Sequence, residues 1–151
     1  MTGNPIRRYM TGLPQRIAPG QTLADAHQIM RKNRIRHLPV IDRGTLVGII
    51  SMGDLHLVET LQDVDPSEVP VEDAMTPRPY AVGPEEPLER VVARMESRKL
   101  GSAVVVEGGE VVGVFTTNDA LRVLAELLEK KKQQKPQKAQ KAQSRRVARA
   151  S

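Results

Sequence analysis

The chain has 151 residues, a net charge of +5 and no cysteine or tryptophan, a length that suits one compact domain or two small, mutually dependent halves. The absence of cysteine excludes disulfides and thiolate metal sites, and the three histidines form no ligand pair or nucleophile motif, so we predict no metal site, no cofactor and no catalytic residue. No apolar run approaches the roughly 20 residues of a membrane span, and the first ten residues lack the pattern of a signal peptide, so we expect a cytoplasmic protein without a membrane partner.

The first predicted helix follows a stretch punctuated by prolines. Leu23, His27 and Met30 fall on one face of a helix with 3.6 residues per turn. Thr22 and Asp25 have the spacing of a capping box at the start of that helix. We therefore predict a helix that begins at Leu23, with His27 as a half-buried packing residue.

Two apolar runs follow, HLPVI at residues 37–41 and LVGII at residues 46–50, and turn-forming residues separate them. This pattern predicts two strands joined by a tight hairpin. Consecutive apolar positions favour strands that are covered on both faces. A second helix is predicted to begin after the sequence Ser51-x-x-Asp54.

Residues 61–74 read as an acidic linker, after which the whole pattern repeats. A shift of 65 residues aligns residues 10–55 with residues 75–120 without a gap, and eleven of the 46 pairs are identical, against about three expected by chance. The segments GIISMGDLH (48–56) and GVFTTNDAL (113–121) are the end of this repeat. We predict an α+β fold of two strand–helix–strand–strand–helix (βαββα) repeats, residues 1–60 and 75–129, packed sheet to sheet about a pseudo-two-fold axis.

The last helix and the end of the chain have different compositions. The helix is predicted to bury a stripe made of Leu121, Leu124, Ala125 and Leu128. Residues 130–151 hold nine lysines and arginines and no acid, whereas residues 1–129 carry fourteen basic and eighteen acidic side chains. This composition predicts a disordered basic tail. The tail is either a solubilising extension or a weak contact for nucleic acid.

The duplicated motifs resemble a tandem pair of CBS domains, named for cystathionine β-synthase and also called a Bateman module. The resemblance is carried by DAMTPRP (73–79), by IRHLPVID (35–42) and by the repeated ending G-h-h-[ST]-x-x-D, where h is apolar. It covers residues 10 to about 128. It implies a regulatory homodimer that binds an adenosyl ligand, such as AMP, ADP, ATP or S-adenosylmethionine, in a cleft between the repeats.

The repeated hydroxyl-to-acid spacing has two explanations. Ser51 with Asp54, and Thr116 with Asp119, can each form a capping box that starts a helix without any ligand. The same carboxylates can accept hydrogen bonds from the two hydroxyls of a ribose, as acids do in dinucleotide folds. Because the residues around the two motifs differ, we expect two unequal sites.

Other positions acquire a role through the family resemblance. Basic side chains before the first hairpin strand would meet phosphate, or they could simply form a solvated edge. Apolar side chains would flank adenine, or they could simply be part of the core. The positions concerned are Arg36, His37, Gly101 and Ser102 for phosphate, and Ile17, Ile35, Val82 and Leu100 for adenine.

Three functions remain open from sequence. The first is a non-catalytic sensor of energy or metabolite state that binds an adenosyl ligand. The second is a dimeric scaffold that needs no ligand, in which both motifs are only helix caps. The third is a nucleic-acid-associated protein that binds through residues 130–151. An enzyme is not predicted, because no nucleophile, metal set or pair of catalytic acids is present.

Overall fold

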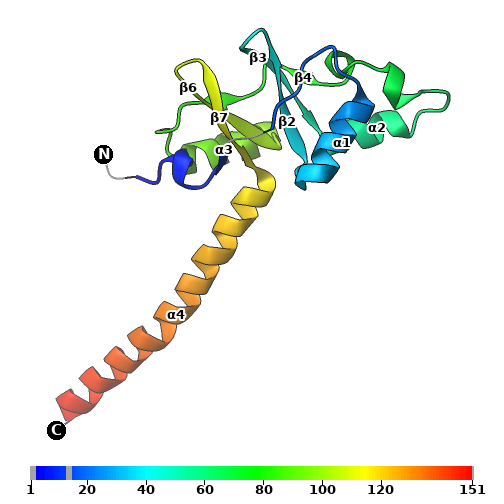
Figure 1. Ribbon diagram of the computed structural model, residues 1–151. Helices are drawn as coiled ribbons and strands as arrows, with labels where there is room; N and C mark the ends of the chain where they lie inside the picture. Colours follow the sequence, from blue (N-terminus) through cyan, green and yellow to red (C-terminus); the bar gives the residue numbers. More distant parts are fainter. Residues whose placement is uncertain (1–2, 13–14, 151) are drawn as a thin grey trace. The chain divides into compact units, whose positions relative to one another are not determined.

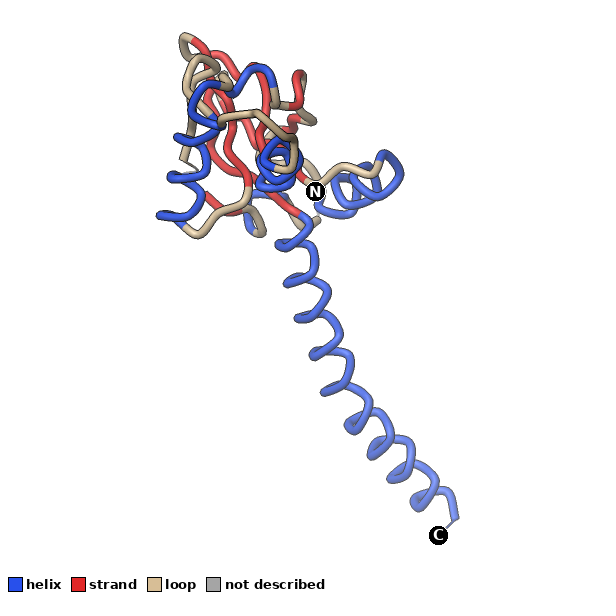
Figure 2. The backbone as a smooth tube through the Cα atoms, turned by 90° about the vertical axis from the view of Figure 1, so that its right-hand side faces the viewer, coloured by secondary structure: helices blue, strands red, loops and turns tan. Residues whose placement is uncertain are grey.

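The computed structural model describes residues 3–12 and 15–150, with side chains up to residue 134. The chain divides into two compact units, Met1–Thr116 and Thr117–Ser151. The first unit holds all the strands, and Figure 2 shows these strands gathered between its helices. The second unit is helix α4 (Thr117–Ala150).

Both predicted hairpins are present, and each belongs to its own sheet (Figure 1). The hairpins have matching registers, with His37 opposite Ser51 in the first and Ser102 opposite Thr116 in the second. Each hairpin also has one irregularity at the same place in the repeat, after Val40 in the first copy. The first sheet has the order β2-β3-β4 and the second β1-β7-β6-β5. The strands are β1 (Thr11–Gly12), β2 (His37–Asp42), β3 (Thr45–Ser51), β4 (Thr76–Pro77), β5 (Ala81–Val82), β6 (Ser102–Glu107) and β7 (Glu110–Thr116).

The first segment of each repeat crosses to the sheet of the other repeat. Strand β1 pairs with β7 of the second repeat, and β4 pairs with β3 of the first. The residues just before these strands cross over as well. The Ile6 N–H donates to the carbonyl of Glu86, and the Val71 N–H donates to the carbonyl of Gln21. Because each repeat supplies a strand to the other, the two repeats form one cooperative unit.

Local features of the chain mark where the helices begin and end. Thr22 caps α1 in a complete capping box with Asp25, as predicted. Arg34 and Lys99, at equivalent positions of the two repeats, end α1 and α3 in the left-handed region with φ of 54° and 55°. The remaining elements are α1 (Leu23–Asn33), α2 (Met52–Glu59), α3 (Leu88–Arg98) and the 3-10 turns η1 (Ile6–Arg8), η2 (Pro66–Glu68) and η3 (Val71–Asp73).

The core confirms the predicted α+β fold in which two sheets face each other. One buried cluster fills the first repeat beneath α1 and includes Leu38 and Met30. A second buried cluster combines Ile49 of the first repeat with Val104 and Val114 of the second. Side chains from the two sheets therefore share one apolar interface.

The last helix differs from its prediction in two respects. The prediction that this helix buries a stripe is wrong. Leu121, Leu124 and Leu128 are between 50% and 62% exposed, and Ala125 is exposed as well. These residues lie in the separate second unit instead of the core of the first. Residues 130–150 are helical, where the composition predicts disorder. The tail is rich in lysine, arginine, glutamine and alanine, which form helices readily even when no apolar surface is buried.

Gly48 lies at the crossing of the two repeats and leaves no room for a side chain. A β-carbon built on Gly48 would lie 2.9 Å from the carbonyl oxygen of Thr76 and 2.5 Å from the sulfur of Met75. We expect Gly48→Ala to lower the free energy of unfolding by about 1–3 kcal/mol, because β4 must move away from β3. Urea denaturation measures the change. Gly20→Ala is the control, because nothing lies within 4 Å of its added carbon, and equal losses in the two variants would contradict this prediction.

Candidate ligand site at the strand ends

Ser51 and Asp54 form a complete capping box where β3 ends and α2 begins. The backbone N–H of Ser51 donates to Asp54 Oδ2 at 2.8 Å, and the Ser51 hydroxyl donates to the same oxygen at 2.9 Å. The backbone N–H of Asp54 donates to Ser51 Oγ at 3.2 Å. These bonds need no ligand, so the cap alone explains the spacing of this motif.

The cap uses only one of the two oxygens of Asp54. Both bonds that the Asp54 carboxylate accepts in the box fall on Oδ2, and Oδ1 accepts no hydrogen bond within the described part of the chain. An ionised carboxylate has about four acceptor positions, and the Asp54 side chain is only half-buried. The carboxylate can therefore cap the helix and still accept bonds from a hydroxyl-bearing ligand.

The start of β2 lies beside this cap. His37 is opposite Ser51 in the hairpin, and the carbonyl of Arg36 accepts a hydrogen bond from the Met52 N–H at 2.8 Å. The Arg36 side chain is exposed, and that of His37 is half-buried. The Asp54 carboxylate, the Ser51 hydroxyl and the backbone of Arg36 therefore lie together at one end of the first sheet.

The second repeat brings its equivalent residues to the same place. Gly101 corresponds to Arg36 after the shift of 65 residues, and a β-carbon built on Gly101 would lie 3.8 Å from His37 Nε2. Ser102 follows Gly101 and lies opposite Thr116 across the second hairpin. The strand starts of the two repeats thus meet, which joins the predicted residues 36, 37, 101 and 102.

Asp119 has different surroundings from Asp54. It lies in the first turn of α4, in the second unit, and only 3% of it is exposed. Its Oδ1 accepts a hydrogen bond from Arg122 Nη2 at 2.9 Å. The two acids of the repeated motif therefore differ in exposure and in charge partner. The spacing of three residues between Asp119 and Arg122 could have predicted this ion pair.

The four predicted adenine neighbours differ in how accessible they are. Ile17 is buried in the core of the first repeat, where its backbone bonds with Pro39 and Ile41. Ile35 is half-buried against the same core. Val82 on β5 and Leu100 after α3 are half-buried. Partial exposure makes Ile35, Val82 and Leu100 more available to a ligand than Ile17.

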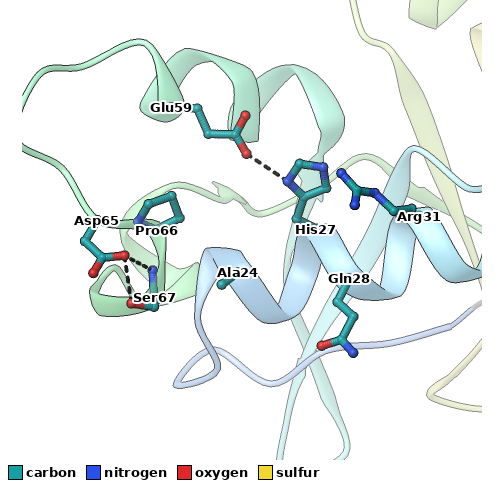
Figure 3. A pocket seen from close by; sticks show the side chains of 8 residues that line it. All are labelled: Ala24, His27, Gln28, Arg31, Glu59, Asp65, Pro66 and Ser67. Atoms are coloured by element: carbon teal, nitrogen blue, oxygen red, sulfur yellow. Dashed lines mark hydrogen bonds and ion pairs between the residues drawn. The ribbon is translucent and has the colours of Figure 1, made fainter.

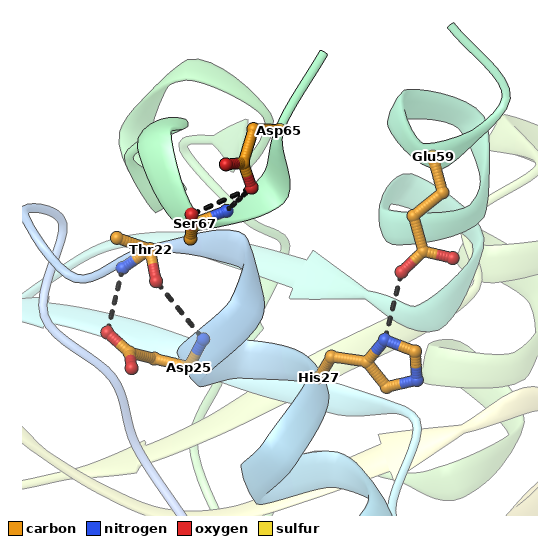
Figure 4. Close-up of polar contacts among 6 residues, drawn as sticks. All are labelled: Thr22, Asp25, His27, Glu59, Asp65 and Ser67. Atoms are coloured by element: carbon orange, nitrogen blue, oxygen red, sulfur yellow. Dashed lines mark hydrogen bonds and ion pairs between the residues drawn. The ribbon is translucent and has the colours of Figure 1, made fainter. Parts of the chain in front are cut away.

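A cavity of 370 Å³ lies elsewhere, between α1, the end of α2 and η2 (Figure 3). Four of its polar lining residues are paired, whereas Gln28 and Arg31 line it without a bond to the other lining residues. His27 Nδ1 is 2.9 Å from Glu59 Oε1, and Asp65 Oδ1 accepts bonds from the hydroxyl and the backbone N–H of Ser67 (Figure 4). The hydroxyl bond, and then the backbone bond, lower the pKa of the Asp65 carboxyl. The His27–Glu59 contact joins α1 to the end of α2, a role for His27 that the sequence does not indicate, whereas the Asp65–Ser67 bonds lie within the turn at η2.

No cluster of three or more His, Cys, Asp or Glu side chains suited to a metal ion occurs among the described residues. Within the same residues, no helix is both long and apolar enough to cross a membrane.

Comparison with known proteins gives consistent matches. The CBS domain family matches residues 6–58 and 71–126. Inosine-5'-monophosphate dehydrogenase of Korarchaeum cryptofilum is 34% identical over 106 residues, which are 68% of this chain and 21% of the dehydrogenase. The chain therefore spans about a fifth of that relative's length.

Two solved structures with bound adenosyl compounds have the same fold. The structure of CBSX2 in complex with AMP matches with a TM-score of 0.71 and 25% identity, covering 82% of this chain and 98% of that one. The CBS domain pair of MJ0100, in complex with 5'-methylthioadenosine and S-adenosyl-L-methionine, matches with a TM-score of 0.74 and 25% identity. That match covers 83% of this chain and 98% of the MJ0100 pair.

Proposed function

This chain belongs to the CBS domain family, and from that premise we propose that it is a non-catalytic regulatory protein that binds an adenosine-containing ligand between its repeats. AMP, ADP, ATP and S-adenosylmethionine are the ligands in question. The proposal includes a cytoplasmic location and a homodimeric state. The ligand would shift the protein between two conformations by its difference in affinity for them.

One observation carries the proposal, namely the meeting of the two strand starts beside the Ser51–Asp54 cap. The free oxygen of Asp54 can accept bonds from the vicinal hydroxyls of a ribose. The same carboxylate would repel a phosphate, so the phosphate needs a separate cationic group. We assign this role to the exposed side chain of Arg36, whose backbone carbonyl is bonded to Met52 at the cap. Gly101 of the second repeat lies next to His37, since a β-carbon built on Gly101 would be 3.8 Å from His37 Nε2.

The bound structures of two relatives support the ligand class. CBSX2 is bound to AMP, and the MJ0100 pair is bound to 5'-methylthioadenosine and S-adenosyl-L-methionine. All three compounds contain adenosine, while only AMP contains a phosphate. Adenosine is therefore the shared element, and the charged group beyond the ribose is what this chain would select through Arg36 and His37. Thr116 with Asp119 is proposed as the weaker second ribose site.

A thermal-shift screen tests the proposal. We expect at least one of AMP, ADP, ATP, S-adenosylmethionine and NAD to raise the melting temperature, with a stabilisation of about 2.7 kcal/mol at 100 times its dissociation constant. UMP is the control, because it keeps the ribose and phosphate but lacks adenine. If none of the adenosine compounds stabilises the protein, or if UMP does so equally, the proposed ligand class is wrong.

A ligand-independent dimeric scaffold is the second candidate function. It is favoured by the exposed leucines of α4, Leu121, Leu124, Leu127 and Leu128, because a contiguous apolar helix face is typical of a protein contact. It is also favoured by the Ser51–Asp54 cap, which is complete without a ligand. An absence of any stabilising adenosine compound in the screen would support this function over the first.

A further inference from the structure

Helix α3 separates its charges onto two edges. Arg90, Arg94 and Arg98 follow one another at steps of four residues, which places them along one edge of the helix. Glu89 and Glu96, seven residues apart, lie along another edge. Each step of four residues rises about 6 Å, so the three guanidinium groups extend over about 12 Å.

Tyr80 lies beside the middle arginine of the row. Arg94 Cζ lies over the ring of Tyr80, 5.8 Å from its centroid. Burial raises the pKa of the Tyr80 phenol. The positive charge of Arg94 acts against that rise, the negative charge of Glu86 adds to it, and Arg90 and Arg98 act against it. The spacing along one edge of α3, with Arg94 on the ring, therefore makes the three arginines one local row.

Most of this positive charge is not neutralised by the protein itself. Arg90 pairs with Glu86 at 3.3 Å, and its side chain is 69% exposed. Arg94 and Arg98 form no ion pair with any residue that the structure describes.

The duplication provides an internal control for this feature. After the shift of 65 residues, the arginine positions correspond to Asp25, Ile29 and Asn33 of α1. Helix α1 has the same length and the same type of C-terminal end without any of the three arginines. The fold therefore does not require the row, which is a property of the second repeat alone.

The row also runs against the composition of its own half of the chain. Residues 61–129 carry fourteen acidic and only six basic side chains. Four of those six basic side chains are the three arginines and the adjoining Lys99. At physiological salt, the interaction between exposed charges is largely screened beyond about 8 Å. An anion beside the row therefore responds mainly to these local charges.

We propose that the Arg90–Arg94–Arg98 row binds the phosphate backbone of double-helical nucleic acid. A guanidinium group matches a phosphate with two parallel hydrogen bonds. A DNA strand carries one phosphate per about 3.4 Å of helix axis, so a row of about 12 Å spans about three phosphates. The row ends at Arg98, only two residues before Leu100 and three before Gly101 of the proposed adenosyl site, but the proposed phosphate contact does not depend on that ligand.

A duplex fits this surface better than an unpaired strand. Proteins that bind single strands use exposed aromatic rings on which bases stack. Phe115 is fully buried, and a guanidinium group covers a face of Tyr80. Contact with phosphates alone gives binding without base readout, which also predicts little sequence preference.

The test is the salt dependence of binding to a fluorescent 20-base-pair DNA duplex, measured by anisotropy with the full chain. The double variant Arg94→Gln with Arg98→Gln removes two charges from the row. We expect weaker binding and a slope of log K against log salt that is shallower by about 1.8, because each lost phosphate contact contributes about 0.9. The basic tail is present in every protein compared, so its contribution cancels.

The matched control is Arg31→Gln with Lys32→Gln, which removes the same charge from the last turn of α1. We expect this control to keep the slope of the unmodified chain. The proposal is overturned if the two double variants lose the same slope, since binding would then depend only on net charge. It is also overturned if the α3 variant keeps the original slope. Circular dichroism establishes that both variants are folded.

Discussion

Replacing Phe115 with alanine is expected to lower the free energy of unfolding by about 3–5 kcal/mol, the loss typical of a large aromatic side chain removed from a core. Phe115 is the only phenylalanine in the chain and is fully buried on β7. Its strand lies between β6 of the same repeat and β1, which comes from the other repeat. A cavity at this position would therefore loosen the pairing within one repeat and the crossing between the two.

Urea denaturation followed by far-ultraviolet circular dichroism measures this loss. Leu57→Ala is the control, because its side chain is 68% exposed and a surface change of this kind alters stability by about 0.5 kcal/mol or less. A loss below about 1 kcal/mol for Phe115→Ala would mean that β7 is not at the centre of the core. A cooperative, single transition in both variants is expected if the repeats fold as one unit.

Local signals in the sequence predict much of this fold. The two hairpins were predictable because apolar runs of strand length flank turn residues, and the duplication shows the pattern twice. The capping boxes at Thr22 and Ser51 were predictable because the hydroxyl and the acid must be three residues apart. The packing of the two sheets against each other was predicted because one repeat of about 50 residues could bury little core alone.

The crossing of β1 and β4 between the repeats was not predictable in the same way. Each of these strands has two residues, which is too short for an alternating pattern to appear. Their partners are set by the docking of one repeat on the other, and by close approaches such as that of Gly48 to Thr76. The exposure of Leu124 on α4 was missed for a related reason, because periodicity identifies an apolar face but not the surface that covers it.

In the candidate site too, contacts between neighbours in sequence were predictable, and contacts that depend on tertiary packing were not. The pairing of Ser51 with Asp54 is local, and the sequence predicts it. The approach of Gly101 to His37 joins residues 64 positions apart, so it depends on how the two sheets pack. The family resemblance selected both residues, whereas composition and spacing alone gave no reason to join them.

Replacing Asp54 with alanine is expected to abolish most of the binding of the adenosyl ligand. A hydrogen bond to a charged group contributes about 1.5–3 kcal/mol, so the loss of two bonds to a ribose costs at least about 3 kcal/mol. Since each 1.4 kcal/mol is a factor of ten, this corresponds to a dissociation constant raised by roughly 100-fold. The effect on folding should be smaller, on the order of 1 kcal/mol, because the substitution also weakens the cap of α2.

Asp25→Ala provides a matched control for the loss of a cap. Asp25 forms the same capping box with Thr22 at the start of α1, and it belongs to no predicted ligand site. We expect Asp25→Ala to lose a similar amount of stability and to keep the ligand affinity of the unmodified protein. Asp119→Ala should reduce affinity less than Asp54→Ala, because Arg122 already engages the Asp119 carboxylate.

The most direct test is a calorimetric titration of AMP, and in parallel of S-adenosylmethionine, into the unmodified chain and the Asp54→Ala, Asp25→Ala and Asp119→Ala variants. We predict that at least one of the two compounds binds the unmodified chain and Asp25→Ala equally, and that Asp54→Ala weakens this binding by roughly 100-fold. If neither compound binds the unmodified chain, or if Asp54→Ala and Asp119→Ala both bind as well as Asp25→Ala, the carboxylates of the repeated motif are helix caps only, and the proposed ligand site is contradicted.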